Sequence, residues 1–310
     1  MVVPCARTVI ELQILICQEQ KNMLESKKIL ITGAAGSIGS ELVRQLIEKN
    51  DIYILDSNET AFFNLYEELQ LKGYKIHGAV GDVRQWGALQ HILSWGNPSF
   101  IFHAAALKHV TPSAWSPEEY ITTNINGTLN MIRFAEKHHS RLVNISTDKV
   151  VNPNSIMAAT KKVAEIAVRD AGQVSVRFGN VMGSRGSVLE IWQRQADSGE
   201  PLTVTDSNAE RYMMTIPEAV RLVIKAAETG NNGDIMILDM GTRVNILRFA
   251  IEILKKAGKK PPFEDKDVKF IGLRPGETTV ETLMTDEEQK RAKKEGEFFI
   301  IEREKHDARI

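Results

Sequence analysis

A glycine-rich turn between an apolar run and a helical pattern constrains this chain more than any other feature. Residues 29–31 are all apolar and predict a short buried strand, which breaks directly into TGAAGSIG at residues 32–39 before helical periodicity begins. Gly33 can adopt the positive φ of a tight turn, Gly36 lets a bound group approach the backbone, and Gly39 lets the helix lie against the strand. A strand, turn and helix of this kind predict an α/β fold with a doubly wound parallel sheet.

The same turn is a candidate binding site for a dinucleotide, because backbone amides at a helix N-terminus face an anion. The residues expected around the phosphates are Gly33, Ala35, Gly36, Ser37, Ile38 and Gly39. The next strand ends at Asp56, about 20 residues beyond the glycines, where a carboxylate can accept both hydrogen bonds of a ribose diol. An ordinary glycine-rich turn is the alternative, and it leaves Asp56 unexplained. Since a carboxylate repels a 2′-phosphate, the sequence favours NAD over NADP.

Length and charge limit the domain organisation. The 310 residues suffice for a full Rossmann-type sheet and a smaller α/β substrate-binding lobe, but not for two large domains. We expect residues 27–175 to form the NAD-binding domain, with a return segment near 210–232, and residues 176–310 to form mainly the substrate-binding lobe. The net charge of −1 gives no sign of a nucleic-acid surface.

Residues 1–26 are expected to be a leader or an amphipathic helix. Their apolar run is interrupted by Glu11 and Gln13 and is far shorter than the ~20 residues of a membrane span, and no signal-peptide cleavage site follows it. The alternative is that these residues come from an extended reading frame whose start was placed before Met23. Cys5 and Cys17 are the only cysteines, and both precede the first strand. We therefore expect no disulfide and no metal site in the folded body, and a cytoplasmic protein.

Small and acidic residues follow the third and fourth predicted strands, residues 76–80 and 99–103. Asp82 and Val83 are expected cofactor contacts. Asp82 could bind an adenine amino group, cap the helix predicted over residues 84–94, or do both. Ala104, Ala105 and Ala106 leave room for a flat cofactor to pass the end of the fourth strand. Lys108 then either meets a substrate hydroxyl or phosphate, or lies on the solvated surface.

The candidate chemical centre lies at the end of the fifth predicted strand, residues 142–145. Thr147, Asp148 and Lys149 follow this strand, and Lys161 lies on the next predicted helix, residues 155–170, one turn after Met157 and on the same face. The end of a parallel strand and the first turn of the next helix meet where open α/β sheets bind ligands. Thr147, Asp148, Lys149 and Lys161 are therefore predicted to be catalytic.

Further candidate substrate contacts are spread over the rest of the chain. Asn124 lies inside the helix predicted over residues 117–138, where it could bend the helix, hold a water near the active site, or be a plain surface amide. Asn180 belongs to a loop expected to cross the crevice. Arg177, Arg211 and Arg274 come from three distant segments and could grip a diphosphate, or each could form a surface ion pair. Residues 235–238, 246–257 and 268–271 are expected to build the lobe.

Several of these segments together resemble one known family. Residues 31–42, 103–110, 146–149, 180–181 and 274–277 are similar to the extended short-chain dehydrogenase/reductases, in the polysaccharide-biosynthesis branch that contains the UDP-N-acetylglucosamine 4,6-dehydratases. The similarity spans residues 27–283 and implies an NAD(P)-dependent lyase acting on a UDP-sugar, with Glu277 among the substrate contacts. It also implies a homo-oligomer, through the long helices at 117–138 and 155–170. A carbon 4 epimerase and a non-catalytic NAD-binding regulator are the alternatives.

Met157 departs from most of this superfamily, which has tyrosine four residues before the helix lysine. A thioether cannot lose a proton, and the resemblance places the chain with the configuration-retaining dehydratases that have Met-x-x-x-Lys. An inactive, degenerate fold is the competing interpretation. In the implied reaction Asp148 is the acid, Lys149 the base, Thr147 lies near the carbon 4 oxygen, and Lys161 binds the nicotinamide ribose. Lys149 can act as a base only with a lowered pKa, which we expect from burial and from Lys161. The group that takes the carbon 4 hydroxyl proton stays open between Asp148 and a water.

Overall fold

A nine-stranded sheet forms the body of the protein. The computed structural model describes residues 23–303 except 93, 260 and 265. The sheet order is β3-β2-β1-β4-β5-β6-β11-β15-β14. These strands are β1 (Lys28–Thr32), β2 (Asp51–Asp56), β3 (His77–Val80), β4 (Phe100–His103), β5 (Arg141–Ile145), β6 (Val174–Arg177), β11 (Ile235–Leu238), β14 (Lys293–Glu295) and β15 (Phe298–Ile301). The strands from β3 to β11 are all parallel, and β15 and β14 close the sheet as an antiparallel hairpin. The predicted doubly wound Rossmann-type sheet is confirmed.

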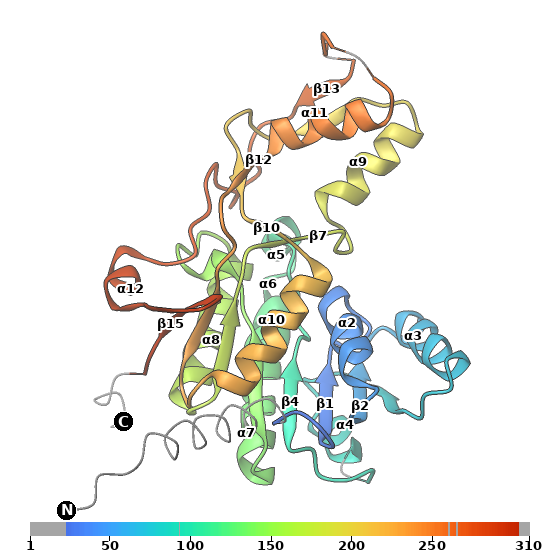
Figure 1. Ribbon diagram of the computed structural model, residues 1–310, viewed down its shortest axis with the longest axis vertical. Helices are drawn as coiled ribbons and strands as arrows, with labels where there is room; N and C mark the ends of the chain where they lie inside the picture. Colours follow the sequence, from blue (N-terminus) through green and yellow to red (C-terminus); the bar gives the residue numbers. More distant parts are fainter. Residues whose placement is uncertain (1–22, 93, 260, 265, 304–310) are drawn as a thin grey trace, which may run out of the picture.

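Helices cover both faces of this sheet (Figure 1). The helices α2 (Ser37–Leu46), α3 (Glu59–Leu71) and α10 (Ile216–Thr229) cover one face, and the other carries α4 (Trp86–Ile92), α7 (Gly127–His138) and α8 (Ile156–Asp170). In β1, Ile29 and Ile31 pack toward the first group of helices and Leu30 toward the second. Buried strands therefore carry apolar side chains on both faces, which is why they appear as continuous apolar runs in the sequence.

The long helix predicted over residues 117–138 is present but interrupted. It consists of α6 (Pro117–Tyr120), a π-helical turn over Ile121–Asn126, and α7. Asn124 lies in the π-helical turn. Its side-chain amide donates to Leu107 O and its carbonyl accepts from Leu107 N, at 3.0 and 2.8 Å. This exchange fixes the wide turn to the loop that follows β4.

The boundary expected at residue 176 needs a correction. Strand β11 pairs with β6 in the main sheet, with Ile235 opposite Ser175, and the β14–β15 hairpin extends the sheet beyond it. All four residues of β11 are buried, so their apolar run belongs to the body rather than to the lobe. The return segment is present, because α10 packs against α2, but it continues through β11 and resumes with the final hairpin.

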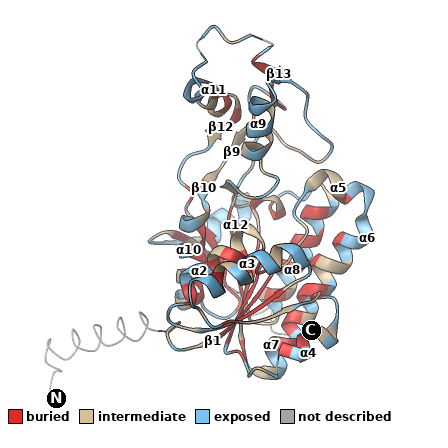
Figure 2. Ribbon diagram, turned by 90° about the vertical axis from the view of Figure 1, so that its right-hand side faces the viewer, coloured by how far each residue is buried: buried red, intermediate tan, exposed pale blue. Residues whose placement is uncertain are grey.

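The lobe stands at one end of this body (Figure 1). It contains α9 (Val188–Asp197), β8 (Leu202–Val204), β9 (Glu210–Arg211), β12 (Val244–Asn245), α11 (Ile246–Lys256) and β13 (Val268–Phe270). A small core of its own, around Trp192, holds it together. Figure 2 shows the buried residues of the body concentrated on the sheet and on the inner sides of its helices, with the lobe's core separate above them.

Several short elements remain. Two of them, β7 (Asn180–Met182) and β10 (Met213–Thr215), lie where the chain passes to and from the lobe, and they pair with each other. The remaining short elements belong to the body: α5 (Val110–Trp115) follows β4, a 3-10 turn over Asp148–Val150 follows β5, and α12 (Asp286–Arg291) precedes the final hairpin. The expectations for residues 1–26 and for both cysteines fall almost entirely outside the described residues. Within the described part of the chain, no helix has the length and apolar composition that a membrane span requires.

Candidate active site

A cleft of about 1200 Å³ opens between the carboxyl ends of the parallel strands and the lobe. Its walls come from the turn after β1, the segments after β4 and β5, the start of α8, the segment after β7, and the lobe. Pockets for one small ligand usually enclose roughly 300–1,000 Å³. The cleft is therefore larger than a site for one small ligand requires.

The glycine turn forms one end of the cleft. Gly33 has φ +66°, and a Cβ atom there would lie 2.5 Å from Ala105 N. A Cβ atom on Gly39 would lie 2.1 Å from Gly33 O, so only glycine lets α2 start this close to β1. Gly36 precedes α2 and lines the cleft, where a Cβ atom would meet only Gly33 O, at 3.1 Å. The turn thus leaves the first amides of α2 open toward the cleft.

The carboxylate of Asp56 stabilises this turn from the end of β2. Its two oxygens accept hydrogen bonds from Ala35 N and Asn58 N, both at 2.8 Å. Asn58 lines the cleft next to it. Asp56 therefore stands beside the glycine turn, as the spacing predicts, and its contact with a ribose stays a prediction.

Two of the three alanines and two turn residues lie as expected at this end, whereas Ala105 does not line the cleft. Ala104 and Ala106 line the cleft, and Ala105 packs against Gly33. Ser37 and Ile38 line it as well, and Ser37 Oγ accepts a hydrogen bond from Arg185 N at 3.0 Å. This bond joins the segment after β7 to the start of α2, across the cleft.

Asp82 and Val83 do not line the cleft. Asp82 accepts from Arg84 N at 2.8 Å and pairs with the Arg84 guanidinium at 2.7 Å, while α4 begins only at Trp86. Asp82 therefore does not cap the helix predicted over residues 84–94. It forms a turn and an ion pair with Arg84, two residues before α4 begins. The Val83 side chain is buried in the core, close to Gly127, which removes it from the expected cofactor contacts. A contact between Asp82 and adenine stays a prediction.

The segment after β5 carries the predicted chemical centre into the cleft. Thr147 caps the 3-10 turn, and its hydroxyl donates to Asp148 Oδ1 at 3.0 Å. The Asp148 carboxyl is fully buried, and its Oδ2 has no hydrogen-bond partner among the described residues. Burial raises the pKa of Asp148 to about 6, against the pull of the neighbouring Lys149 ammonium. This carboxyl can therefore hold a proton near neutral pH.

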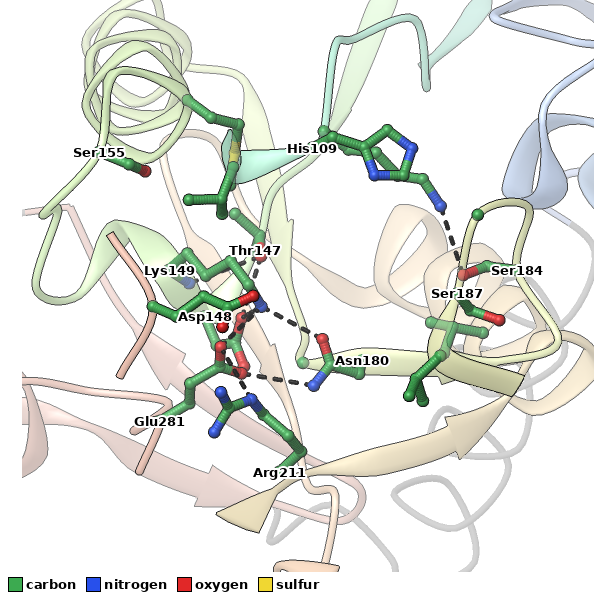
Figure 3. A pocket seen from close by; sticks show the side chains of 18 of the residues that line it. His109, Thr147, Asp148, Lys149, Ser155, Asn180, Ser184, Ser187, Arg211 and Glu281 are labelled. Atoms are coloured by element: carbon green, nitrogen blue, oxygen red, sulfur yellow. Dashed lines mark hydrogen bonds and ion pairs between the residues drawn. The ribbon is translucent and has the colours of Figure 1, made fainter. Parts of the chain in front are cut away.

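The Lys149 ammonium sits among three acceptors (Figure 3). Its Nζ lies 3.1 Å from Asp148 Oδ1, 3.0 Å from Glu281 Oε1 and 3.2 Å from Asn180 Oδ1. Burial acts to lower the pKa of Lys149, but the two carboxylates outweigh burial and raise it. The expected lowering of this pKa is therefore wrong, because no sequence pattern indicates a second carboxylate beside Lys149.

Lys161 is turned toward the sheet rather than toward Lys149. Its Nζ donates to Ile145 O at 2.5 Å, and burial lowers its pKa to about 8. Met157, one turn earlier on α8, is buried and lines the cleft beside it. The expected sharing of one helix face by Met157 and Lys161 is thus present at the cleft.

Two predicted substrate contacts are corrected by the structure. The Arg177 side chain is fully buried and pairs with Glu165 at 2.6 Å and Glu288 at 2.8 Å, so it joins α8, β6 and α12 and cannot grip a diphosphate. Asn124 is also buried, and its amide is used by Leu107 and by Thr160 Oγ1 at 3.0 Å. Neither residue lines the cleft, so both support the segments around it through buried contacts.

The other predicted substrate contacts do line the cleft. Lys108 Nζ donates to Ser184 Oγ at 3.3 Å, across the cleft from the Asp148 cluster (Figure 3). Arg211 donates to Thr278 O and Thr279 O, which fixes the segment before Glu281. Arg274 and Glu277 form a loose ion pair of 3.8 Å at the edge.

Glu281 is a residue of the site that no pattern in the sequence predicts. It pairs with Lys149 and with Arg211 Nε, at 3.0 and 3.3 Å, and lines the cleft. A β-bridge between Glu210 and Val280 brings its segment beside β9. A lone glutamate far along the chain carries no local signal, and only this long-range pairing places it next to Lys149.

Known proteins of similar sequence and fold were compared with the chain. The family described as "Polysaccharide biosynthesis protein" matches residues 29–303. The capsular polysaccharide biosynthesis protein CapD of Staphylococcus aureus is 40% identical over 278 residues, which are 86% of this chain and 46% of CapD. The chain thus spans about half the length of that curated relative. A protein named UDP-glucose 4-epimerase from Rickettsia bellii is 34% identical, over 90% of this chain and 84% of its own length.

Solved structures share the fold. The X-ray structure of Pen from Bacillus thuringiensis is 33% identical and has a TM-score of 0.82, with 90% of this chain and 88% of Pen covered. A dTDP-glucose 4,6-dehydratase from Bacillus anthracis, solved in complex with NAD, has a TM-score of 0.71 at 19% identity, over 81% of this chain and 86% of its own. At that identity the second similarity concerns the fold alone.

Proposed function

Because the chain belongs to the polysaccharide biosynthesis family of extended short-chain dehydrogenase/reductases, we propose that it is an NAD-dependent UDP-N-acetylglucosamine 4,6-dehydratase. The product would be UDP-2-acetamido-2,6-dideoxy-4-keto-hexose. The observation that carries this proposal is the pair of buried Asp148 and half-buried Lys149, one acid and one amine 3.1 Å apart, on the wall of a cleft that starts at a glycine turn.

The residues at the turn fit a dinucleotide. Gly33 and Gly39 bring β1, α2 and the alanine segment so close together that a Cβ atom at either glycine would clash with backbone, and the first amides of α2 face the cleft. Gly36, Ser37 and Ile38 would hold the pyrophosphate, and Asp56 the adenine-side ribose. The carboxylate of Asp56 disfavours the 2′-phosphate of NADP. The dTDP-glucose 4,6-dehydratase of Bacillus anthracis has the same fold and was solved with NAD bound, which supports a nicotinamide dinucleotide in general. The preference for NAD over NADP rests on Asp56.

When bound, NAD would supply the redox chemistry, by accepting a hydride from sugar carbon 4 and returning it to carbon 6. The protein's own task is then to move protons. The carbon 4 hydroxyl and carbon 5 each release one proton, and the departing carbon 6 hydroxyl and the final carbon 5 each take one up. The site therefore needs at least two groups that change protonation state during one turnover.

The Asp148–Lys149 pair can provide both groups. A proton that passes from Lys149 Nζ to Asp148 Oδ1 breaks an N–H bond and forms an O–H bond, and leaves a neutral acid beside a neutral amine. Because the two neighbouring carboxylates raise the pKa of Lys149, its neutral amine forms through this transfer to Asp148 rather than by loss of a proton to solvent. Asp148 then serves as the acid at the carbon 6 oxygen and Lys149 as the base at carbon 5. Thr147, bonded to Asp148, orients the carboxyl toward the substrate. Met157 lines the cleft but cannot replace the tyrosinate of related enzymes.

A carbon 4 epimerase is the second candidate, because the chain matches a protein of that name over most of both lengths. Epimerisation needs the oxidation at carbon 4 but no acid at carbon 6. The pKa of about 6 for Asp148, which leaves a carboxylic acid available near neutral pH, favours dehydration.

Mass spectrometry of the product separates the two functions. The purified chain is incubated with NAD and UDP-N-acetylglucosamine, and with UDP-glucose in parallel. Loss of the mass of one water indicates dehydration, whereas an isomer of unchanged mass indicates epimerisation and would refute the proposal.

A pair of variants assigns the chemistry to the cleft. Asp148→Asn should still bind NAD but form no keto-sugar, since an amide cannot donate the proton. Glu287→Gln, which changes an exposed carboxylate outside the cleft, should behave as the wild type. A normal rate in Asp148→Asn would remove Asp148 from the mechanism.

We further propose that two copies of the chain associate through the helices beside the cleft. Ile121, Leu129, Val163 and Ile166 are large apolar residues of the π-helical turn, α7 and α8, and each is more than two-fifths exposed. Exposed apolar side chains on neighbouring helices favour a two-fold contact. Light scattering should show a dimer, and Leu129→Glu with Val163→Glu should give a monomer. A wild-type monomer at micromolar concentration would refute this.

A further inference from the structure

Glu281 has no role in the mechanism proposed above, yet it occupies the centre of the charged cluster. Its carboxylate accepts ion pairs from Lys149 at 3.0 Å and Arg211 at 3.3 Å, and a weaker hydrogen bond from Asn180 Nδ2 at 3.4 Å. The side chain is only 9% exposed. Figure 3 shows Glu281 below Lys149 and Asp148, with Arg211 on its other side.

The charges in this cluster alternate along a chain of contacts. They run from Asp148 to Lys149, from Lys149 to Glu281, and from Glu281 to Arg211. Burial acts to raise the pKa of Glu281, but the two cations outweigh burial and lower it. Glu281 therefore stays ionised, while Asp148, whose Oδ2 is buried without a described partner, is the carboxyl that takes up a proton.

We propose that Glu281 is a positioning residue for the dehydration: its carboxylate holds the Lys149 amine against Asp148 and keeps the proton of the cluster on the Asp148–Lys149 pair. This inference rests on the proposed function, since it names the residue that sets the proton positions of the same site. Glu281 contacts the two reacting groups from the side of Arg211 and takes up no proton itself.

The Glu281 charge favours the acid form of Asp148 and, by the same effect, raises the pKa of Lys149. Beside an ionised Glu281, a second negative charge on Asp148 is unfavourable, so a proton on Asp148 is retained. Asn180 and Arg211 hold the Glu281 carboxylate in position. The carboxylate can therefore keep the Lys149 side chain in place after Lys149 has passed its proton to Asp148. Without this carboxylate, Lys149 would have Asp148 as its only ionic partner among the described residues.

The other cationic side chains near Asp148 and Lys149 are bonded to other partners. Lys161 is bonded to Ile145 O on the sheet side. Lys108 lies across the cleft, bonded to Ser184. Arg211 donates to backbone carbonyls and, among the described residues, forms an ion pair with Glu281 alone. Loss of the Glu281 charge therefore removes a negative neighbour from Asp148 and from Lys149 while the nearby cations stay.

A purely structural ion pair is the competing explanation, and Glu288 provides its matched control. Glu288 lies seven positions along the same segment, is 15% exposed, and pairs with buried Arg177 outside the cleft. Glu288→Gln should lower the free energy of unfolding without a change in the titration of Asp148. Glu281→Gln should change that titration.

Infrared titration of the purified full-length chain tests the proposal without any turnover. The wild type should show a protonated-carboxyl band that disappears as the pH rises through about 6, and Asp148→Asn should lack it. In Glu281→Gln the midpoint should move down by about one pH unit, the size of shift that one neighbouring charge produces. In Glu288→Gln the midpoint should stay at the wild-type value. An unmoved midpoint in Glu281→Gln would overturn the proposal.

The pH dependence of kcat provides a second readout if keto-sugar is formed. The alkaline fall that reports loss of the Asp148 proton should move to lower pH in Glu281→Gln, while KM for the UDP-sugar changes less than threefold. A lower kcat with an unmoved profile would mean a structural role only. If the wild type forms no keto-sugar, the proposed function fails, but the infrared midpoint still decides the role of Glu281.

Discussion

Replacement of Gly39 by alanine tests the close contact between α2 and β1. A Cβ atom at this position would lie 2.1 Å from Gly33 O and 2.7 Å from Ala34 Cα, where ordinary contacts begin at 3.4 Å. Both neighbours are backbone atoms, so no side chain can turn away. The start of α2 would have to move outward by roughly an ångström, together with the amides that face the cleft.

The expected cost follows from two opposing effects. Overpacking of this kind typically costs about 1–3 kcal/mol, and a clash with backbone belongs at the upper end. Alanine in place of glycine within a helix returns up to about 1 kcal/mol through its higher helix propensity. We therefore expect Gly39→Ala to lower the free energy of unfolding by about 2 kcal/mol and to weaken NAD binding as well.

Gly36→Ala is the matched comparison, because this glycine lies three residues earlier in the same turn. Its φ of −73° is open to any residue, and a Cβ atom would meet only Gly33 O, at 3.1 Å. We expect stability within about 1 kcal/mol of the wild type. The added methyl group would project to where the pyrophosphate should lie, so NAD affinity should fall at least about tenfold, or about 1.4 kcal/mol.

Urea denaturation followed by tryptophan fluorescence measures the stability of both variants, and calorimetry measures their NAD affinity. The two variants should separate, with Gly39→Ala losing stability and Gly36→Ala losing mainly affinity. Wild-type stability in Gly39→Ala would refute the contact described here. Wild-type affinity in Gly36→Ala would refute the assignment of the turn to the pyrophosphate.

Three further predictions concern the buried charges and Met157. Burial raises the pKa of Asp148 from 3.8 to about 6, so between pH 7 and pH 5 the folded protein takes up a proton that the unfolded chain does not, and its stability rises as the pH falls. In urea denaturation the free energy of unfolding of Asp148→Asn should exceed that of the wild type, and the difference should be about 1 kcal/mol larger at pH 7 than at pH 5. A difference that grows as the pH falls to 5 would contradict this sign. Arg177→Met leaves buried Glu165 with the longer Lys162 contact of 3.5 Å in place of its close cation and should cost about 3–5 kcal/mol of unfolding free energy in the same assay, whereas a cost below 1 kcal/mol would mean that the Arg177–Glu165 pair is dispensable. Met157→Leu preserves side-chain volume and should keep the rate of keto-sugar formation within about threefold, so a complete loss would assign the thioether a chemical part.

Local patterns in the sequence were enough for much of this fold. Short apolar runs indicated the strands β1 to β5, and helical periodicity indicated α8 to within one residue of its observed ends. The glycine turn could be predicted because its requirements are local: one positive φ, one open amide and one close approach within seven residues. Thr147, Asp148 and Lys149 could be placed at the cleft because the carboxyl ends of parallel strands lie at one edge of a sheet.

Contacts between distant segments could not be predicted in this way. Arg177 and Arg211 are equally good candidates for a diphosphate contact when only the sequence is considered. In the structure Arg177 is enclosed by Glu165 and Glu288, whereas Arg211 lines the cleft. Strand β11 appears as an apolar run that fits either the body or the lobe, and only its pairing with β6 decides. The pKa of Lys149 depends on Glu281, 132 positions later, which reaches it through the bridge between Glu210 and Val280. Periodicity and turn chemistry act between near neighbours along the chain, whereas the charge state of a buried group depends on whatever the completed fold brings within a few ångströms of it.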